Sequence, residues 1–256
     1  MKKFMLFGFL CAVVLAISGV SPAHADFTAY IIRGDATFNI NGSNIEFVTD
    51  QSGEKAGLGS NDVNGATLGS ITKLHIDRID DVTRFAAGSG PAVAPYLNFW
   101  ITDGAGHFAV VANEPSDAVF QPLYNGGYNL SFASLSNKVA KIYENSDKSW
   151  LPKAGVGLTF QDLAGFTILA PSSAQLAAGW AGLGTGAPRE YQTNVAYGVN
   201  WVFGDTLSNY LTDRTGYIVT GAQVSASAPV PEPCTMLLLG SGLAGIAAYR
   251  RKCKKA

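Results

Sequence analysis

The chain has 256 residues, of which 47% are hydrophobic and only 14% are charged, and its formal net charge is −1. Between Asp26 and Ala228, however, 11 Lys and Arg face 18 Asp and Glu, so this stretch carries a net charge near −7. It lacks the clustered cations that nucleic-acid phosphates require, which excludes nucleic acid as a partner. All three cysteines lie outside it, so it can form no internal disulfide.

Residues 1–25 have the organisation of a secretory signal peptide. Two lysines precede an almost unbroken apolar run that ends at Val20, and a Ser-Pro pair then breaks the run. The small residues Ala23 and Ala25 occupy the −3 and −1 positions that signal peptidase recognises, with Asp26 as the first mature residue. A retained transmembrane helix is the alternative, and the Ser-Pro break argues against it. We therefore expect export with cleavage before Asp26.

Residues 26–224 have the composition of a β domain, rich in Gly, Asn, Ser, Thr and aromatic residues. Asn-Gly-Ser at 41–43 and Asp-Gly-Ala-Gly at 103–106 each separate two apolar runs and indicate hairpin turns. We predict strands at 27–33, 36–40, 45–49, 68–76, 82–86, 96–102, 108–113, 128–132, 156–160, 166–170, 195–203 and 216–225.

Helical signals in this region are few. An apolar stripe between Leu135 and Tyr143 fits either a helix or a strand, and residues 172–178 fit two helical turns. The passages 51–65, 87–95 and 178–188 are rich in Gly and Ser, and we predict them as loops. Many short strands with so little helix favour an all-β fold, an antiparallel β-sandwich or jelly roll.

The C-terminus combines a stalk, an apolar segment and a basic tail. Residues 225–233 are rich in Ala, Ser and Pro, and Thr235 to Tyr249 contains no charge. Fifteen residues make about 22 Å of helix, which is shorter than the bilayer core of about 30 Å. A buried terminal helix is the alternative. The cations Arg250, Arg251 and Lys252 follow at once, which favours a short transmembrane helix at 234–249 with residues 250–256 in the cytoplasm.

The end of the chain also resembles a known signal. Val230, Pro231, Glu232 and Pro233, followed by an apolar helix and a cationic cluster, are similar to the PEP-CTERM sorting signal of Gram-negative bacteria, also catalogued as the ice-binding protein C-terminal domain. Cys234 stands where a hydroxyl residue is common. The resemblance implies transient anchoring in the inner membrane, processing by an exosortase-like enzyme, and a place on the cell surface or in an extracellular matrix with exopolysaccharide.

Catalytic residues are hard to place in the domain. It has two histidines, His75 and His107, and contains no cysteine or Gly-x-Ser-x-Gly motif. We therefore predict a non-catalytic structural or binding domain. A secreted glycan hydrolase is the alternative, because such enzymes use two carboxylates; its candidates are Asp103, Glu114, Asp162 and Glu190. Ice binding is suggested by the name of the tail alone, and the domain has no regular Thr-x-Thr ladder.

Two further features suggest ligands. Clusters at 61–64 and 77–81 contain Asp and Asn oxygens that suit calcium, although solvated turns are the favoured interpretation and we predict no cofactor. Trp100 and Trp201 lie in predicted strands and are expected in the core. Trp150 and Trp180 lie in predicted loops, where each ring could stack on a sugar of an extracellular polysaccharide or cover the edge of the core.

Overall fold

The computed structural model describes residues 26–81, 83, 93–113, 116–125, 128–145, 147–179, 186–205, 210–213 and 216–227. The predicted signal peptide, the transmembrane helix and the basic tail all lie outside these ranges. Within these ranges, no helix has the length and apolar character needed to cross a bilayer.

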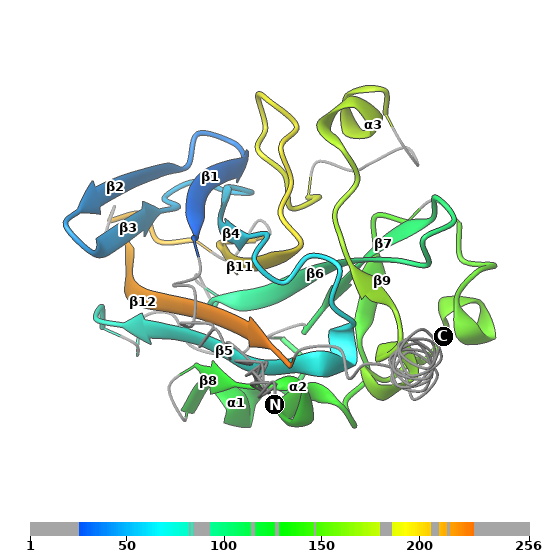
Figure 1. The fold of residues 1–256 in the computed structure, drawn as a ribbon. Helices are drawn as coiled ribbons and strands as arrows, with labels where there is room; N and C mark the ends of the chain where they lie inside the picture. The colour runs from blue at the N-terminus through cyan, green and yellow to red at the C-terminus, as the bar shows by residue number, and fades with distance from the viewer. Residues whose placement is uncertain are drawn as a thin grey trace, which may run out of the picture.

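The described chain folds into two antiparallel sheets that lie face to face (Figure 1). The all-β prediction is confirmed, and the two packed layers are consistent with a sandwich. The seven-stranded sheet has the order β1 (Thr28–Arg33), β4 (Lys55–Ser60), β11 (Val199–Phe203), β6 (Tyr96–Thr102), β7 (Phe108–Ala112) and β9 (Lys141–Tyr143), with β10 (Thr167–Ile168) beside β6. The five-stranded sheet has the order β2 (Thr37–Asn41), β3 (Asn44–Val48), β12 (Tyr217–Ala226), β5 (Ile71–Arg78) and β8 (Asn129–Leu130).

Among the described residues, helical structure is limited to short segments of three to five residues. The described α-helices are α1 (Gln121–Asn125), α2 (Phe132–Leu135) and α3 (Ser173–Ala177), and 3-10 turns cover Leu68–Ser70, Pro152–Gly155 and Gln161–Leu163. The helix predicted at 172–178 is confirmed as α3. Its first turn carries a capping box, in which Ser172 and Gln175 bond each other's backbone.

Aromatic side chains fill the space between the sheets. Phe203 from the seven-stranded sheet stacks on Phe47 from the five-stranded sheet, with ring centroids 4.2 Å apart and planes 11° from parallel. Trp201 is fully buried beside them, as predicted. Each such side chain contributes about 1.5–3 kcal/mol by leaving water. Trp100 is also fully buried, but it belongs to a second cluster with Phe108 and Leu176.

Strand β4 was not predicted, because it lies in the Gly-rich passage 51–65 that we expected to be a loop. The strand is buried along its whole length and pairs with both β1 and β11. A Cβ atom at Gly57 would lie 2.5 Å from the Tyr30 ring, and one at Gly59 would lie 2.5 Å from the Tyr197 ring. These glycines are therefore required by the tyrosine rings that lie against them, and the loop prediction was wrong.

Other boundaries differ from the predictions in smaller ways. The strand predicted at 156–160 does not form, and Thr159 makes only an isolated bridge to Val139. The stretch between Leu135 and Tyr143 divides into the end of α2 and strand β9. The strand predicted at 82–86 lies almost entirely outside the described residues.

The end of the domain also extends further than expected. Strand β12 continues to Ala226, two residues past the predicted boundary at 224, and pairs there with β5. The Ser227 amide then donates to the Ser70 carbonyl at 2.8 Å. The first residues of the predicted stalk are therefore held by the five-stranded sheet.

The contact between the tyrosines and the glycines of β4 can be tested by adding single methyl groups. We expect Gly57→Ala and Gly59→Ala each to lower the free energy of unfolding by about 1–3 kcal/mol, because a methyl group there forces a ring out of a packed position. Gly165→Ala is the control, since its Cβ would meet no atom within 4 Å and its φ is not positive. Denaturant unfolding of the processed protein measures the differences. Equal midpoints for Gly59→Ala and Gly165→Ala would contradict this packing.

Candidate functional site

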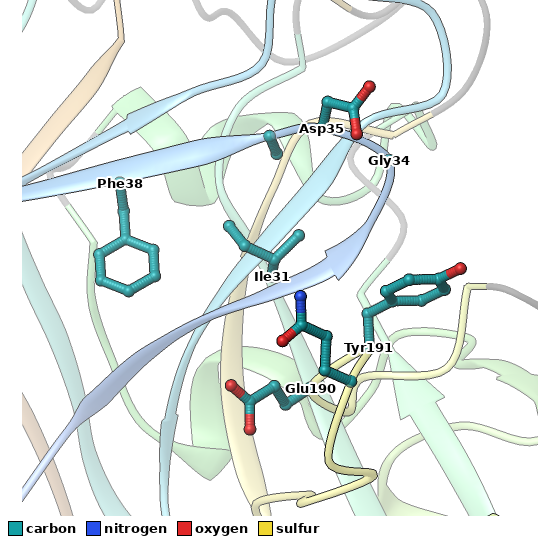
Figure 2. A pocket seen from close by; sticks show the side chains of 8 residues that line it. Ile31, Gly34, Asp35, Phe38, Glu190 and Tyr191 are labelled. Carbon is teal, nitrogen blue, oxygen red and sulfur yellow. The ribbon is translucent and has the colours of Figure 1, made fainter.

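A surface pocket lies between the β1–β2 connection and the loop formed by residues 186–198 (Figure 2). Its volume is about 410 Å³. The lining combines apolar side chains, two carboxylates, an amide and a phenol, and comprises Ile31, Gly34, Asp35, Ala36, Phe38, Glu190, Tyr191 and Gln192.

The wall formed by Glu190 to Gln192 belongs to a tight, docked turn. Within the turn, the Glu190 amide donates to the Val195 carbonyl at 2.7 Å, and the Asn194 amide donates to the Glu190 carbonyl at 3.0 Å. Asn194 has a φ of +56°, which asparagine tolerates better than most residues. The Tyr191 amide donates to the Ile31 carbonyl at 2.9 Å, which attaches the turn to strand β1. The Tyr191 side chain is consequently presented to solvent and is 67% exposed.

The opposite wall depends on a glycine and an arginine. Gly34 has a φ of +73°, and a Cβ atom there would lie 3.0 Å from the Glu54 side chain, so only glycine fits this turn without strain. The neighbouring Arg33 guanidinium donates to the carbonyls of Gly53 and Asp205, the latter at 2.7 Å. The start of this wall is therefore fixed before any ligand binds.

The two carboxylates of the pocket do not converge. Figure 2 shows Asp35 and Glu190 on opposite sides, with Ile31 between them. The Thr193 hydroxyl donates to one oxygen of Glu190, so that carboxylate is already partly engaged. An exposed ring next to an apolar floor and several hydrogen-bonding groups suits a neutral polyol such as a sugar. Of the lining residues, only Glu190 was a candidate from the sequence.

Trp150 lies at the end of the sandwich near the β6–β7 turn, and its ring is half-buried. Its indole N–H donates to the Asp147 carbonyl at 2.8 Å. The ring stacks on His107, with centroids 5.9 Å apart, and meets the Phe166 ring edge-on at 5.3 Å. These contacts favour the interpretation that Trp150 covers the edge of the core. Trp180 lies outside the described residues.

The β6–β7 turn holds an ion pair beside Trp150. The Asp103 carboxylate lies 2.7 Å from His107 Nδ1, and its other oxygen accepts from the Ala105 amide at 2.8 Å. The hydrogen bond that His107 makes to the Asp103 carboxylate raises the pKa of His107 above its ordinary value, although the imidazole is partly exposed. The pair therefore stabilises the turn.

The other described hydrolase candidates bond to local partners and not to this pair. Asp162 accepts from both the amide and the hydroxyl of Thr159 at 2.9 Å, so it closes a local turn. Glu114 lies outside the described residues. Asp103, Asp162 and Glu190 each bond to local partners, and no hydrogen bond within the described chain joins any two of them.

Side chains of both clusters considered for calcium make hydrogen bonds or ion pairs within the protein. Asp80 forms a buried ion pair with Arg78 and accepts from the Ile218 amide at 3.2 Å. In the other cluster, the Asn61 side chain accepts from the Gly198 amide at 2.9 Å. Within the described ranges, no three His, Cys, Asp or Glu side chains gather as a metal site would require.

Asp62 of the same cluster contacts the predicted mature N-terminus. Its carboxylate accepts from the Asp26 backbone nitrogen at 2.7 Å. Cleavage before Asp26 would convert that amide nitrogen into an ammonium group, which would strengthen the bond with a charge.

The described domain ends at Ser227, and the sorting signal follows it. A family profile described as the PEP-CTERM protein-sorting motif matches residues 229–252. The chain therefore carries a PEP-CTERM sorting motif after the described domain. The match includes all of the predicted sorting residues, Val230 to Pro233, and the predicted anchor from Thr235 to Lys252. The motif directs a protein to the cell surface and implies processing by an exosortase-type enzyme. No curated protein and no solved structure matched the chain.

The Asp103–His107 pair predicts a pH-dependent turn. A raised histidine pKa means that the stabilisation is fully present below the unfolded value of about 6.5 and is lost as the pH rises through the folded value. We expect the NMR titration of the His107 imidazole in the processed protein to have a midpoint above that of a free histidine. Asp103→Asn should lower the midpoint. A His107 midpoint that Asp103→Asn leaves unchanged would contradict the assignment.

Proposed function

We propose that the mature domain is a non-catalytic surface or extracellular-matrix protein that binds neutral exopolysaccharide after exosortase-dependent sorting. The PEP-CTERM motif supports the destination. The pocket beside Tyr191, preformed and open to solvent, is the observation that carries the binding role.

The charge of the domain favours an uncharged polymer. Residues 26–228 carry a net charge near −7, and two carboxylates line the pocket. An anionic polysaccharide would be repelled by this field at low salt, whereas sugar hydroxyls can donate to carboxylates and amide oxygens. The exposed Tyr191 ring provides an apolar face for one sugar ring. Such contacts are weak one at a time and gain strength when a polymer engages many copies of the protein.

The geometry of the pocket favours binding over hydrolysis. A glycoside hydrolase needs two carboxyl groups flanking one glycosidic bond. Here Asp35 and Glu190 lie on opposite sides of Ile31, and Thr193 already bonds to Glu190 (Figure 2). The hydrolase alternative predicts release of reducing ends from the bound polysaccharide, and loss of that release in Glu190→Gln.

We expect the processed protein to co-sediment with the neutral polysaccharide of the cells that produce it. Tyr191→Ala should weaken the binding about fivefold to tenfold, because losing one stacked ring costs about 1–1.4 kcal/mol. Val156→Ala is the control, since Val156 is 72% exposed and does not line the pocket. Trp150→Ala tests the other predicted contact and should lower stability more than binding.

Two results would contradict the proposal. Wild-type protein that stays in the supernatant at every salt and calcium concentration does not bind this glycan. If binding survives Tyr191→Ala and is lost in a folded Trp150→Ala variant, the glycan contacts the β6–β7 end of the domain and not the pocket.

A further inference from the structure

Strand β2 forms a free edge of the five-stranded sheet. It pairs with β3 on one side, and no described strand pairs with the other side. Figure 1 shows the β2–β3 hairpin projecting from the rest of the domain at the left of the view. All residues of β2 except Phe38 are exposed, and Ile40 is 65% exposed although it is a large apolar residue.

The register of the β2–β3 hairpin determines which backbone groups of β2 point outward from the sheet. Asn41 pairs with Asn44 across a turn of two residues, and Gly42 has the positive φ of +62° that a type II′ turn needs at its first central position. Such a turn closes on a hydrogen-bonded pair, and hydrogen-bonded pairs then alternate along the ladder. Residues 37, 39 and 41 therefore bond to β3. The N–H and C=O groups of Phe38 and Ile40 point outward from the sheet.

This edge lacks the features that usually prevent strands of different molecules from pairing. Natural edge strands carry lysine, proline or a bulge. Residues 36–43 contain no charge and no proline, and the register between β2 and β3 is unbroken. The other described edges differ: β9 begins with Lys141, β8 has two residues, and the Ile31 carbonyl of β1 already binds the Tyr191 turn.

We propose that β2 pairs antiparallel with β2 of a second copy of this chain, about a two-fold axis at Asn39. The outward groups of Phe38 then bond to those of Ile40 in the second copy, and the reverse pair forms on the other side of the axis. Phe38 and Ile40 lie on the same face of the strand, so each exposed isoleucine meets a phenylalanine ring, a favourable cross-strand pair.

The pattern of β2 favours a second copy as the occupant of this edge, because the outward backbone groups of Phe38 and Ile40 are complementary to each other about Asn39. Two domains that each carry a net charge near −7 repel one another, and the uncharged β2 edge is where they can approach with the least repulsion. Two five-residue strands bury less than the roughly 1,000 Å² of a stable complex, so the pairing is weak in dilute solution. It becomes significant where sorting concentrates the protein on a surface.

A single cysteine at the proposed axis tests the register directly. Opposed Asn39 residues would form a non-hydrogen-bonded pair with Cα atoms about 4.5 Å apart, within the range of about 4.4–6.8 Å for a disulfide. In a chain carrying Cys234→Ser and Cys253→Ser, we expect Asn39→Cys to give a disulfide-linked dimer under mild oxidation. Val156→Cys, which is exposed and lies outside every described strand, is the control. Equal dimer yields from the two variants would overturn the proposal.

A charge at the edge tests the same pairing without a covalent link. Ile40→Lys should raise the dimer dissociation constant at least about tenfold, because it places two cations beside a shared strand edge. Val156→Lys should leave the constant unchanged, and circular dichroism checks that both variants fold. Sedimentation velocity measures the association, and equal constants for the two variants would overturn the proposal. Polysaccharide binding by the Ile40→Lys variant is measured as well. If this variant is monomeric and still binds polysaccharide, loss of pairing is distinguished from failure of the proposed function.

Discussion

Two tyrosine rings lying against two glycines organise the outer face of the seven-stranded sheet. Tyr30 belongs to β1, and Tyr197 belongs to the loop that carries the pocket, yet both rings occupy the space where β4 has no side chains. The rings also contact each other, with centroids 5.2 Å apart. Because β4 lies between β1 and β11, this contact joins both strands to the loop.

A buried hydrogen-bond network reinforces the same region. The Tyr30 hydroxyl donates to the Asn200 side chain at 2.6 Å, and the Asn200 amide donates to the Tyr197 carbonyl at 2.8 Å. Burial raises the pKa of Tyr30, which keeps its phenol neutral and able to donate. On the same sheet, Lys55 and Asp205 form an ion pair at 2.9 Å, although burial lowers the pKa of Lys55 despite its partner. The backbone carbonyl of Asp205 also accepts a hydrogen bond from Arg33 beside the pocket.

The sequence predicted features that depend on neighbouring residues and missed features that depend on distant ones. Strands with clear apolar alternation were found, and β6 was found with its observed bounds at Tyr96 and Thr102. The sorting motif was recognised because its residues lie together in one stretch of the sequence. Strand β4 was missed because its glycines are explained only by rings contributed from elsewhere in the chain. The pocket was not predicted for the same reason, because its walls come from two distant segments, the β1–β2 connection and the turn near residue 191.

Trp150 illustrates how a correct local prediction can leave the function open. Its place in a loop was predicted, but its ring could not be assigned to a ligand or to the core from the sequence. The assignment depends on His107 and Phe166, which approach the ring from other parts of the chain. Tyr191 differs from Trp150, because its backbone is bonded to β1 while its side chain extends into solvent and does not cover the core. In the sequence, the signal for an exposed ring was a tyrosine surrounded by polar residues, in Glu-Tyr-Gln-Thr-Asn.

The packing of Tyr197 on Gly59 holds the pocket loop in place. Hydrogen exchange at the Tyr191 amide tests it most directly, because that amide bonds to the Ile31 carbonyl of β1 only while the loop is docked. We expect this exposed turn to show a protected Tyr191 amide in the processed protein, and much faster exchange there in folded Gly59→Ala than in Gly165→Ala. An amide that exchanges freely in the wild-type protein, or that Gly59→Ala does not affect, would contradict the account.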